Sequence, residues 1–307
     1  MSFTPATAKA LADIDLVPRV IEGLVQVALS EDLGDGVDVT SLATVPFDLE
    51  GVADFTARAS GVVAGLPVVR AVLEVVTDDS VVISQHVQDG AAVSAGDVLL
   101  TARALVRALL TAERTALNIL CHLSGIATMT RRWVDEVQGT RAQILDTRKT
   151  NPGLRALEKY AVRCGGGTNK RMGLYDAALI KDNHVLAAGG VAEAFRAVRE
   201  LFPDVEVQVE CDTVEQVKEA VEVGASFLLL DNMSLEDLRA SVDLVAGRAE
   251  LEATGGLTLD RARAVAETGV DYLSVGGLTH SAPVLDIGVD LRPGTPSQTG
   301  NSARGEN

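Results

Sequence analysis

The stretch VEVQVECDTVEQVKEAVEVGASFLLLDN, residues 205–232, contains a short apolar run, a segment with helical spacing and a second short apolar run. Strands that alternate with helices in this way form parallel sheets covered by helices. Six runs of this kind, each followed by a helical pattern, predict a parallel α/β barrel rather than an open sheet. They are AQILDT, AALIKDN, VEVQVEC, SFLLLDN, AELEATGG and DYLSVGG, between residues 142 and 277.

Polar residues or glycines stand at the carboxyl end of every one of these six predicted strands. In a parallel barrel all these ends lie at one rim, where the loops that follow the strands build the active site. We therefore expect the six ends to lie close together although they are far apart in sequence. In chain order they are Asp146-Thr147-Arg148-Lys149, Lys181-Asp182-Asn183, Glu210, Asp231-Asn232, Thr254-Gly255-Gly256 and Gly276-Gly277.

The sign of the local net charge changes in the segment that contains the first two of these strand ends. The whole protein has 307 residues and a formal net charge of −16. From Arg148 to Lys181, however, eight Lys or Arg residues stand against only Glu158 and Asp176, a local balance of +6. Arginine binds carboxylates and phosphates through two parallel hydrogen bonds, and lysine binds them as a point charge. The reversal indicates that this part of the rim binds an anion.

The remaining strand ends suit a phosphate and a metal ion or a sugar. Glycine pairs after two late strands let backbone N–H groups approach phosphate oxygens, at a place where barrels often bind phosphate. Glu210 and Asp231 would face the same space as the cations. Two readings stay open for these acids: they hold Mg²⁺ through a diphosphate, or they stabilise a positively charged sugar centre.

The rest of the chain has a different character. Residues 1–15 are expected to form an N-terminal tail, and 16–33 an amphipathic helix with Pro18 near its start. Short β-rich runs follow in 50–104, and 105–137 are expected to form two helices broken near Ser124-Gly125. The predicted domains are an α/β sandwich with a helical connection over 16–124, a barrel over 125–291 and a disordered tail over 292–307.

Composition excludes several classes of protein. An acidic balance with 3% aromatic residues argues against a general nucleic-acid binder. No apolar run approaches the roughly 18–20 residues that a membrane span needs. The N-terminus lacks the pattern of a secretory signal, and three widely spaced cysteines form neither a disulfide framework nor a zinc site. We expect a cytoplasmic protein with reduced cysteines.

Four blocks of the sequence resemble the quinolinate phosphoribosyltransferase family, also called carboxylating nicotinate-nucleotide pyrophosphorylases. The resemblance covers about residues 18–291. It implies an N-terminal α/β sandwich, a TIM-like barrel with fewer than eight complete units, and a homodimer with shared active sites. The blocks are ERTALNILCHLSGIAT (113–128), DTRKTNPGLRALEKYAVRCGGGTNKRMGLYDAALIKDNH (146–184), EATGG (252–256) and SVGGLTHSAPVLDIGVDL (274–291).

The resemblance also implies an activity and a role for each matching residue. The activity is phosphoribosyl transfer from 5-phosphoribosyl 1-diphosphate to quinolinate, with decarboxylation and with Mg²⁺ as cofactor. The residues implied for the quinolinate carboxylates are Arg148, Lys170, Arg171, Lys181 and, from the neighbouring subunit, Arg114. Those implied for phosphoribosyl diphosphate are Thr147, Arg148, Lys149, Glu210, Asp231, Thr254, Gly255, Gly256, Val275, Gly276 and Gly277. Lys149, Glu210 and Asp231 are the implied catalytic residues.

One position departs from the family pattern, and other functions compete with the one implied. The family usually has His where this chain has Lys170, which retains a cation but loses the titration of an imidazole. One competing function is that of a phosphoribosyltransferase with the same fold and another acceptor for the phosphoribosyl group, as in a nicotinate-specific enzyme or a molybdenum-transport-associated relative. Another is a non-catalytic phosphosugar-binding protein. Five cations suit two carboxylates better than one, and the acids needed for catalysis are present. The sequence assigns no role to His184 or His280.

Overall fold

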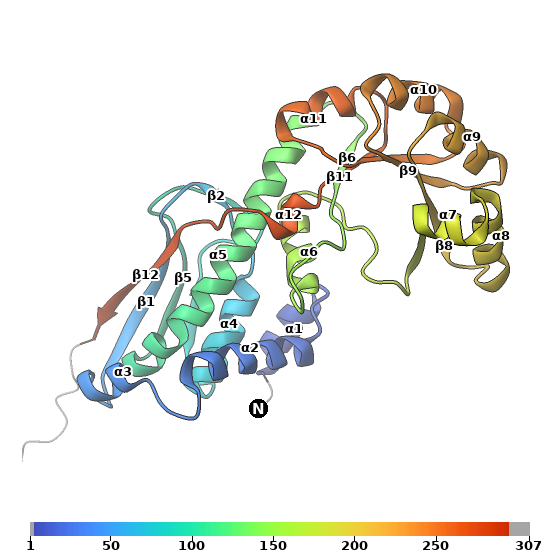
Figure 1. Ribbon diagram of the computed structural model, residues 1–307. Coiled ribbons are helices and arrows are strands. Elements are labelled where there is room, and N and C mark those ends of the chain that lie inside the picture. The colour runs from blue at the N-terminus through green and yellow to red at the C-terminus, as the bar shows by residue number, and fades with distance from the viewer. Residues whose placement is uncertain (1–2, 295–307) are drawn as a thin grey trace, which may run out of the picture. The chain divides into compact units, whose positions relative to one another are not determined.

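The structure is a computed structural model that describes residues 3–294, and its two compact units are treated separately (Figure 1). The first unit contains residues up to Gly125 together with the segment from Pro283 onward, and the second contains Ile126–Ala282. None of the helices in the described part of the chain is both long and apolar enough to cross a membrane.

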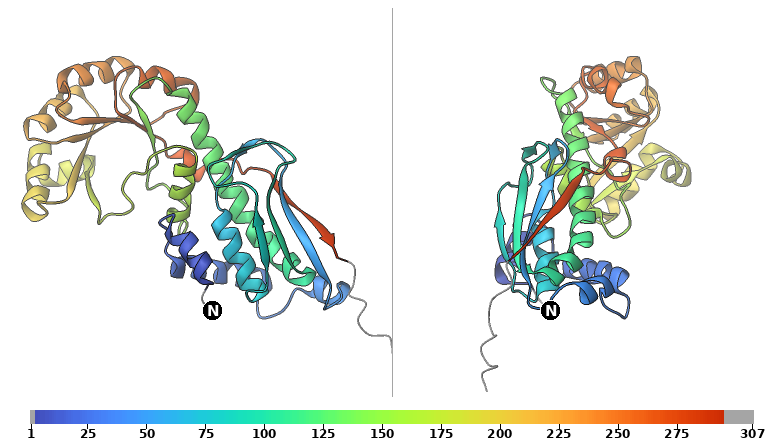
Figure 2. Two further views of the ribbon diagram at one scale, coloured as in Figure 1. Left: turned by 180° about the vertical axis from the view of Figure 1, so that it is seen from behind. Right: turned by 90° about the vertical axis from the view of Figure 1, so that its left-hand side faces the viewer.

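The N-terminal unit is a four-stranded antiparallel sheet with helices against it (Figures 1 and 2). The strand order is β12-β1-β5-β3. The helix predicted over 16–33 is confirmed as α2, with Pro18 in its first turn and Gly34 at its C-cap. The elements are α1 (Pro5–Ala12), α2 (Pro18–Leu33), α3 (Val39–Thr44), β1 (Glu50–Ala57), β2 (Gly61–Val62), α4 (Leu66–Thr77), β3 (Val82–Gln85), β4 (Ala92–Val93), β5 (Val98–Leu105), α5 (Val106–Glu136) and β12 (Ile287–Pro293).

Two expectations for the N-terminal unit are wrong. The segment 1–15 is not a plain tail, because α1 forms within it and buries Leu11 completely. The β-rich stretch 50–104 contains the helix α4, whose valines and leucines are buried on most sides. A helix buried all round lacks the polar stripe that would distinguish it from a strand in the sequence.

The boundary expected near residue 291 also differs from the structure. β12 pairs with β1 along its whole length, from Gly51 opposite Pro293 to Ala57 opposite Ile287. The chain therefore returns to the first unit at Pro283, and residues 283–291 do not belong to the barrel. Arg292 lies in β12 and donates to Asp54 of β1, and the strand ends at Pro293, whereas residues 295–307 of the predicted tail lie outside the described residues.

The C-terminal unit is a six-stranded parallel sheet wrapped by helices, and it confirms all six predicted strands (Figure 1). The strand order β6-β11-β10-β9-β8-β7 is that of a TIM-like barrel that stays open between β6 and β7. The elements are β6 (Gln143–Leu145), α6 (Arg155–Cys164), β7 (Ala177–Ile180), α7 (Asp182–Ala188), α8 (Val191–Leu201), β8 (Glu206–Cys211), α9 (Val214–Glu222), β9 (Phe227–Asp231), α10 (Leu235–Val245), β10 (Glu250–Thr254), α11 (Leu259–Ala266), β11 (Tyr272–Ser274) and α12 (Gly277–His280).

The free edge of β6 is covered by the chain that follows the three consecutive glycines Gly165–Gly167. Thr168 forms a parallel bridge with Leu145, and its N–H donates to the carbonyl of Ile144 at 2.8 Å. Gly167 lies so close that a Cβ there would be 2.8 Å from methyl carbons of Thr130 and Val162. The segment after the triplet thus takes the place that a seventh strand would occupy.

The break expected near Ser124-Gly125 does not occur, because α5 is one continuous helix of 31 residues. Gly125 serves close packing instead. A Cβ at this position would lie 2.2 Å from the carbonyl oxygen of Pro283 and 2.9 Å from the Cα of Val284. In a sequence, a glycine inside a helical pattern indicates a position where the helix is weakened. Here the glycine instead allows a neighbouring backbone segment to approach closely.

We expect Gly125→Ala to destabilise the protein by about 1–3 kcal/mol, because the added methyl group overlaps backbone atoms that cannot rotate away. Gly23→Ala is the matched control. Gly23 lies inside α2, where an added Cβ would meet nothing within 4 Å, so alanine there should leave stability equal or raise it. Urea unfolding followed by circular dichroism measures both. Equal midpoints for the two variants would contradict the packing role of Gly125.

Candidate active site

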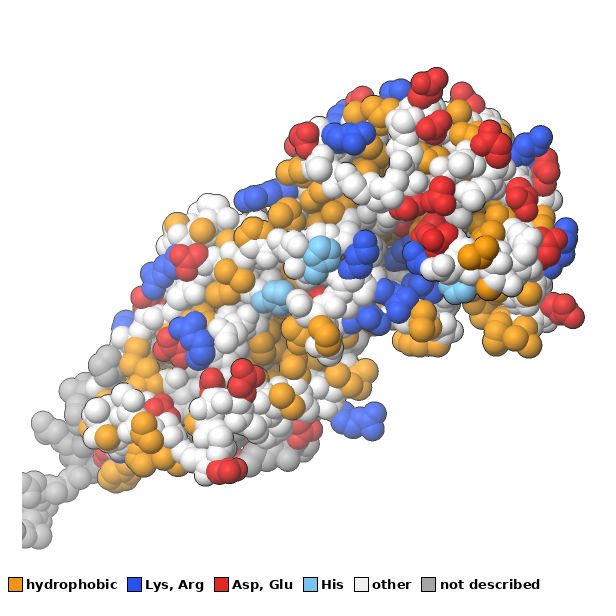
Figure 3. Space-filling view, in the orientation of Figure 1, with side chains coloured by type: hydrophobic (Ala, Val, Ile, Leu, Met, Phe, Trp, Pro, Cys, Tyr) orange, Lys and Arg blue, Asp and Glu red, His pale blue; other side chains and the backbone are white. Residues whose placement is uncertain are grey.

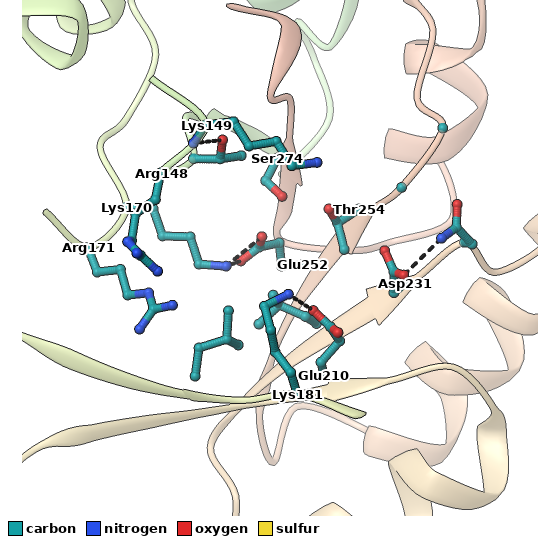
Figure 4. Close-up of a pocket in the computed structure, with 16 residues that line it drawn as sticks. Arg148, Lys149, Lys170, Arg171, Lys181, Glu210, Asp231, Glu252, Thr254 and Ser274 are labelled. Carbon is teal, nitrogen blue, oxygen red and sulfur yellow. Dashed lines mark hydrogen bonds and ion pairs between the residues drawn. The ribbon is translucent and has the colours of Figure 1, made fainter. Parts of the chain in front are cut away.

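The carboxyl ends of the barrel strands surround a cavity of about 600 Å³. It brings together segments that are more than 100 residues apart in sequence, as the pattern of strand ends predicted (Figure 4). The predicted site residues that line it are Thr147, Arg148, Lys149, Lys170, Arg171, Lys181, Glu210, Asp231, Thr254, Gly255 and Gly256.

Four predicted site residues do not line this cavity. Arg114 lies on the part of α5 that belongs to the N-terminal unit. Val275 is buried behind the rim, and Gly276 and Gly277 begin the short helix α12. A Cβ on Gly276 would lie 2.9 Å from Cδ of Lys149, so this glycine lets the lysine side chain pass close to the backbone.

The sequence reasoning missed several residues that line the cavity. Glu252 sits within the otherwise apolar run of β10, and its position two residues before Thr254 was the available signal. The other missed residues are Leu179, Leu229 and Ser274, whereas Asn232 had been placed at the rim without a role. Each lies on or next to a strand whose end had already been assigned to the rim.

Positive and negative side chains enter the cavity from different elements. Arg148, Lys149, Lys170 and Arg171 lie on the segments that cross the gap between β6 and β7, whereas the acids project from β8, β9 and β10 (Figure 4). In the space-filling view, Lys and Arg side chains gather beside Asp and Glu side chains at a hollow of the C-terminal unit (Figure 3). The cavity therefore has a cationic wall, which Lys181 at the end of β7 completes, and an acidic wall.

Two lysine–glutamate pairs connect these walls. Nζ of Lys181 lies 2.6 Å from Oε2 of Glu210, and Nζ of Lys170 lies 2.6 Å from Oε2 of Glu252. The Lys181 side chain is 46% exposed, whereas those of Lys170 and Glu252 are 9% and 0% exposed. Lys181 and Glu210 can therefore separate and bind a ligand that enters from solvent, whereas Lys170 and Glu252 are enclosed by protein.

The two arginines of the cationic wall repel each other, and Asp176 only partly offsets the effect on the pKa of Arg171. Burial lowers the pKa of Arg171, and repulsion from Arg148 lowers it further. Nε of Arg148 is buried and has no hydrogen-bond partner among the described residues. A buried donor without an acceptor is costly, and so are two neighbouring guanidinium groups without an anion. Both costs fall when a carboxylate or phosphate binds between them.

Asp231, Asn232 and Gly255 shape the acidic wall. Asn232 has a positive φ of 54° and donates from Nδ2 to Oδ2 of Asp231 at 2.8 Å. Gly255 has a φ of 84°, and a Cβ there would lie 2.4 Å from Oδ1 of Asn232. Glycine is therefore required at 255 both by its backbone conformation and by space. The backbone at Gly255 is therefore not covered by a side chain, and it lies beside the carboxylate of Asp231.

The acidic wall could contribute to a bound metal ion without enclosing one. Within residues 3–294 no group of three His, Cys, Asp or Glu side chains is arranged to hold a metal. Glu210 and Asp231 nevertheless present carboxylate oxygens to the cavity. Mg²⁺ prefers oxygen ligands and is commonly bound through one or two carboxylates together with substrate phosphates. The residues present fit that mode of binding.

The cation-bearing segments are fastened by a buried ion pair below the cavity. Nζ of Lys159, on α6, contacts Oδ1 of Asp146 at the end of β6, and both residues are fully buried. Asp146 also accepts the N–H of Lys170 at 2.8 Å and Nδ2 of Asn169 at 2.6 Å. Burial raises the pKa of Asp146 and lowers that of Lys159, so each charge depends on the other.

Neighbouring residues of α6 fix the same segments at other points. Glu158 accepts the backbone N–H of Asn151 at 3.1 Å and its side-chain amide at 2.6 Å. Arg155 donates to Oγ1 of Thr150 and to the carbonyl of Met172, both at 3.0 Å. His184 caps the start of α7, because its Nδ1 accepts the N–H of Lys181 at 3.0 Å.

Removing one partner of the buried pair should be strongly destabilising. We expect Lys159→Met to lower the free energy of unfolding by about 3–5 kcal/mol, because the Asp146 carboxylate is left buried without its cation. Lys218→Met is the control, since the Lys218–Glu222 pair spans 3.9 Å on an exposed helix face. Chemical denaturation of both variants tests this. A Lys159→Met protein as stable as the control would contradict the role of the pair.

Comparison with known proteins matches both units of the chain to one family. The profile of the quinolinate phosphoribosyl transferase C-terminal domain matches residues 126–290, and that of its N-terminal domain matches 38–124. A carboxylating nicotinate-nucleotide pyrophosphorylase of Mycobacterium leprae is 51% identical, over 86% of this chain and 94% of its own. A probable enzyme of the same name from Bacillus subtilis is 41% identical, over 85% and 90%.

Solved structures agree with this assignment. The crystal structure of NadC from Streptococcus pyogenes superposes with a TM-score of 0.87 and 38% identity, covering 91% of this chain and 99% of that one. Human nicotinic acid phosphoribosyltransferase, at 12% identity and a TM-score of 0.59, shares the fold alone. The two domain profiles and the relatives that match along most of their length lead to one conclusion: the chain belongs to the quinolinate phosphoribosyltransferase family.

Proposed function

We infer that this protein transfers the phosphoribosyl group of 5-phosphoribosyl 1-diphosphate to quinolinate and decarboxylates the product. The reaction yields nicotinate mononucleotide, diphosphate and CO₂, in the biosynthesis of NAD. The observation that carries this inference is the cavity of a family member in which a cationic wall faces an acidic wall across one space. Such a cavity suits an anionic heterocycle next to a sugar phosphate.

The quinolinate carboxylates are assigned to the cationic wall. Arg148 and Arg171 can each bind a carboxylate through two hydrogen bonds, and the free Nε of Arg148 is one available donor. Lys181 can turn from Glu210 to the ligand, because its side chain is half exposed. Lys170 contributes positive charge from behind, while its ammonium stays with Glu252.

Phosphoribosyl diphosphate is assigned to the opposite wall and to the backbone beside it. The backbone of Thr254-Gly255-Gly256 offers N–H groups to phosphate oxygens. We propose that Val275-Gly276-Gly277, at the next strand end, contributes to the same phosphate site. Thr147 and Lys149 approach from the end of β6. Glu210 and Asp231 lie where the ribose and a diphosphate-bound Mg²⁺ would be held.

The chemistry requires positioning and charge more than proton transfer. The ring nitrogen of quinolinate carries no proton, so it attacks the anomeric carbon without a general base as diphosphate leaves. Glu210 and Asp231 stabilise the positive charge that develops on the ribose, and Lys149 stabilises the leaving diphosphate. When bound, Mg²⁺ would neutralise the diphosphate. The positively charged ring then accepts the electron pair of the departing CO₂, and the ring carbon takes up a proton.

Other acceptors are less consistent with this site. A single carboxylate would use only part of a cationic wall that contains two arginines and two lysines beyond Lys149. Relatives that match most of the chain carry carboxylating or decarboxylating names, and no observation favours the molybdenum-associated or the non-catalytic reading.

We also propose that the enzyme is a cytoplasmic homodimer. Cys121 and Cys211 are free thiols, and burial raises the pKa of Cys211 to about 12, as suits a structural cysteine in a reducing compartment. The dimer is proposed because the family resemblance implies shared active sites, with Arg114 as the residue that a neighbouring subunit contributes. In a dimer Arg114 could enter the site of the neighbouring subunit.

The function is tested by supplying phosphoribosyl diphosphate and Mg²⁺ with either quinolinate or nicotinate. We expect mononucleotide and equimolar CO₂ from quinolinate and little or no product from nicotinate. Labelled quinolinate reports the CO₂, and chromatography reports the nucleotide. Product from nicotinate alone would refute the assignment of substrate. Omitting Mg²⁺ in the presence of a chelator should abolish turnover if the diphosphate carries the metal.

The shared site is tested by mixing two inactive variants. Arg114→Ala and Glu210→Ala are each expected to lose most activity. After the mixture is partly unfolded and reassembled, about a quarter of wild-type activity should return, since half of the dimers are mixed and each has one intact site. A mixture that stays inactive, although mass spectrometry detects mixed dimers, would contradict the role of Arg114 in the neighbouring site.

A further inference from the structure

Glu252 is a buried carboxylate that the proposed reaction does not use. It lies in the middle of β10 between Leu251 and Ala253, and is paired in register with Leu229 of β9 and Tyr272 of β11. Its side chain is 0% exposed, yet it lines the site cavity (Figure 4). Burial of a carboxylate has a large cost unless a cation accompanies it.

The cation that accompanies Glu252 is Lys170. Nζ of Lys170 donates to Oε1 at 2.7 Å and lies 2.6 Å from Oε2, which has no hydrogen-bond partner among the described residues. The same Nζ is 5.8 Å from the ring centroid of Phe227, which adds a cation–π contact. Both contacts come from strands of the barrel, which are rigid elements.

The backbone of Lys170 is fixed separately from its side chain. Its N–H donates to Asp146 at 2.8 Å, and its carbonyl accepts Nζ of Lys159 at 2.9 Å. A lysine side chain ordinarily loses considerable rotamer freedom when it is ordered. Here the ammonium is held at one end by Glu252 and the backbone at the other by the buried pair, so the position of the charge is defined.

The surroundings of Lys170 disfavour its charged form, and Glu252 is the group that opposes them. Burial lowers the pKa of its amine, Arg171 and Lys181 lower it further by repulsion, and Glu252 opposes them. Lys170 also lines a second cavity, of about 390 Å³, whose other ionisable residues are Arg171, Asp176, Glu206, Glu250 and Tyr272. Glu206 and Glu250 are exposed to solvent, and Asp176 is occupied by the N–H groups of Met172 and Gly173.

We propose that Glu252 is a positioning residue of the transferase site, which keeps Lys170 charged and holds its ammonium behind the carboxylate-binding arginines. The proposal rests on the proposed function. It separates the two lysine–glutamate pairs of the cavity by role: Lys181–Glu210 opens when substrates bind, and Lys170–Glu252 stays closed during the reaction.

The test is the pH profile of Glu252→Gln, a change that retains size and removes charge. Losing the carboxylate lowers the pKa of Lys170 further, so the variant should lose kcat/KM as pH rises through the new value, while wild type retains it to higher pH. At the alkaline end the expected loss is about 10- to 100-fold, as for a charged hydrogen bond. Glu250→Gln, on the same strand but exposed, is the control and should follow the wild-type profile.

A double-mutant cycle distinguishes positioning from general destabilisation. In a Lys170→Gln background no buried ammonium remains to be positioned, so adding Glu252→Gln should cause no further loss of kcat/KM. The double variant also leaves no buried charge without a partner. It can therefore still be measured if Glu252→Gln alone folds poorly. An equal loss from Glu252→Gln in both backgrounds, or a wild-type profile for the single variant, would overturn the proposal.

A readout that needs no turnover separates this proposal from the proposed function. NMR of lysine-labelled protein follows the titration of Lys170, with its signal identified by its absence in Lys170→Gln. Glu252→Gln should move that titration to lower pH, and Glu250→Gln should not. Inactive wild-type protein with this shift would overturn the function and support the pairing. An unmoved Lys170 titration would overturn the pairing whatever the activity.

Discussion

The buried ion pair between Asp146 and Lys159 is the interaction on which the site depends. β6 and β7 do not pair, and the chain that crosses the gap between them has sheet-like hydrogen bonds only around Thr168, which forms a bridge with Leu145. That chain carries most of the cationic wall. Asp146 supplements these few backbone bonds, because it accepts Lys159 together with two donors of the 169–170 segment. A buried pair contributes little net stability compared with an apolar contact, but it specifies one arrangement. We therefore interpret it as a device that positions the cations.

The opposition of charges across the cavity follows from the topology. Strands β8, β9 and β10 are held by neighbours on both sides, and they carry the acids on rigid backbone. The cations from Arg148 to Arg171 sit on loops that are fastened chiefly by side chains, among them those of α6, Asp146 and Thr279. Repulsion between Arg148 and Arg171 remains in the free protein and is relieved when an anion binds. Such preorganised charge is the kind of stabilisation that a transition state with separated charges requires.

The sequence predicted local elements well where their period was clear, and it failed where packing decided. All six barrel strands and helix α2 are found where they were expected. The break predicted at Ser124-Gly125 is absent, because Gly125 admits the backbone at Pro283 and does not interrupt α5. The pairing of β12 was not predicted, since its partner β1 is more than 200 residues earlier in the chain. Pairing over such a separation leaves no trace in a local pattern.

The sequence by itself determined the strand ends and the kinds of side chain they carry, because a parallel barrel places all its carboxyl ends at one rim. It also determined the family, through four blocks of residues. The tertiary structure alone decided which charges meet. Lys170 and Glu252 are 82 residues apart, and Lys181 and Glu210 are 29 apart. Which lysine pairs with which acid depends on strand order, on the gap between β6 and β7 and on burial. These properties exist only once the chain has folded.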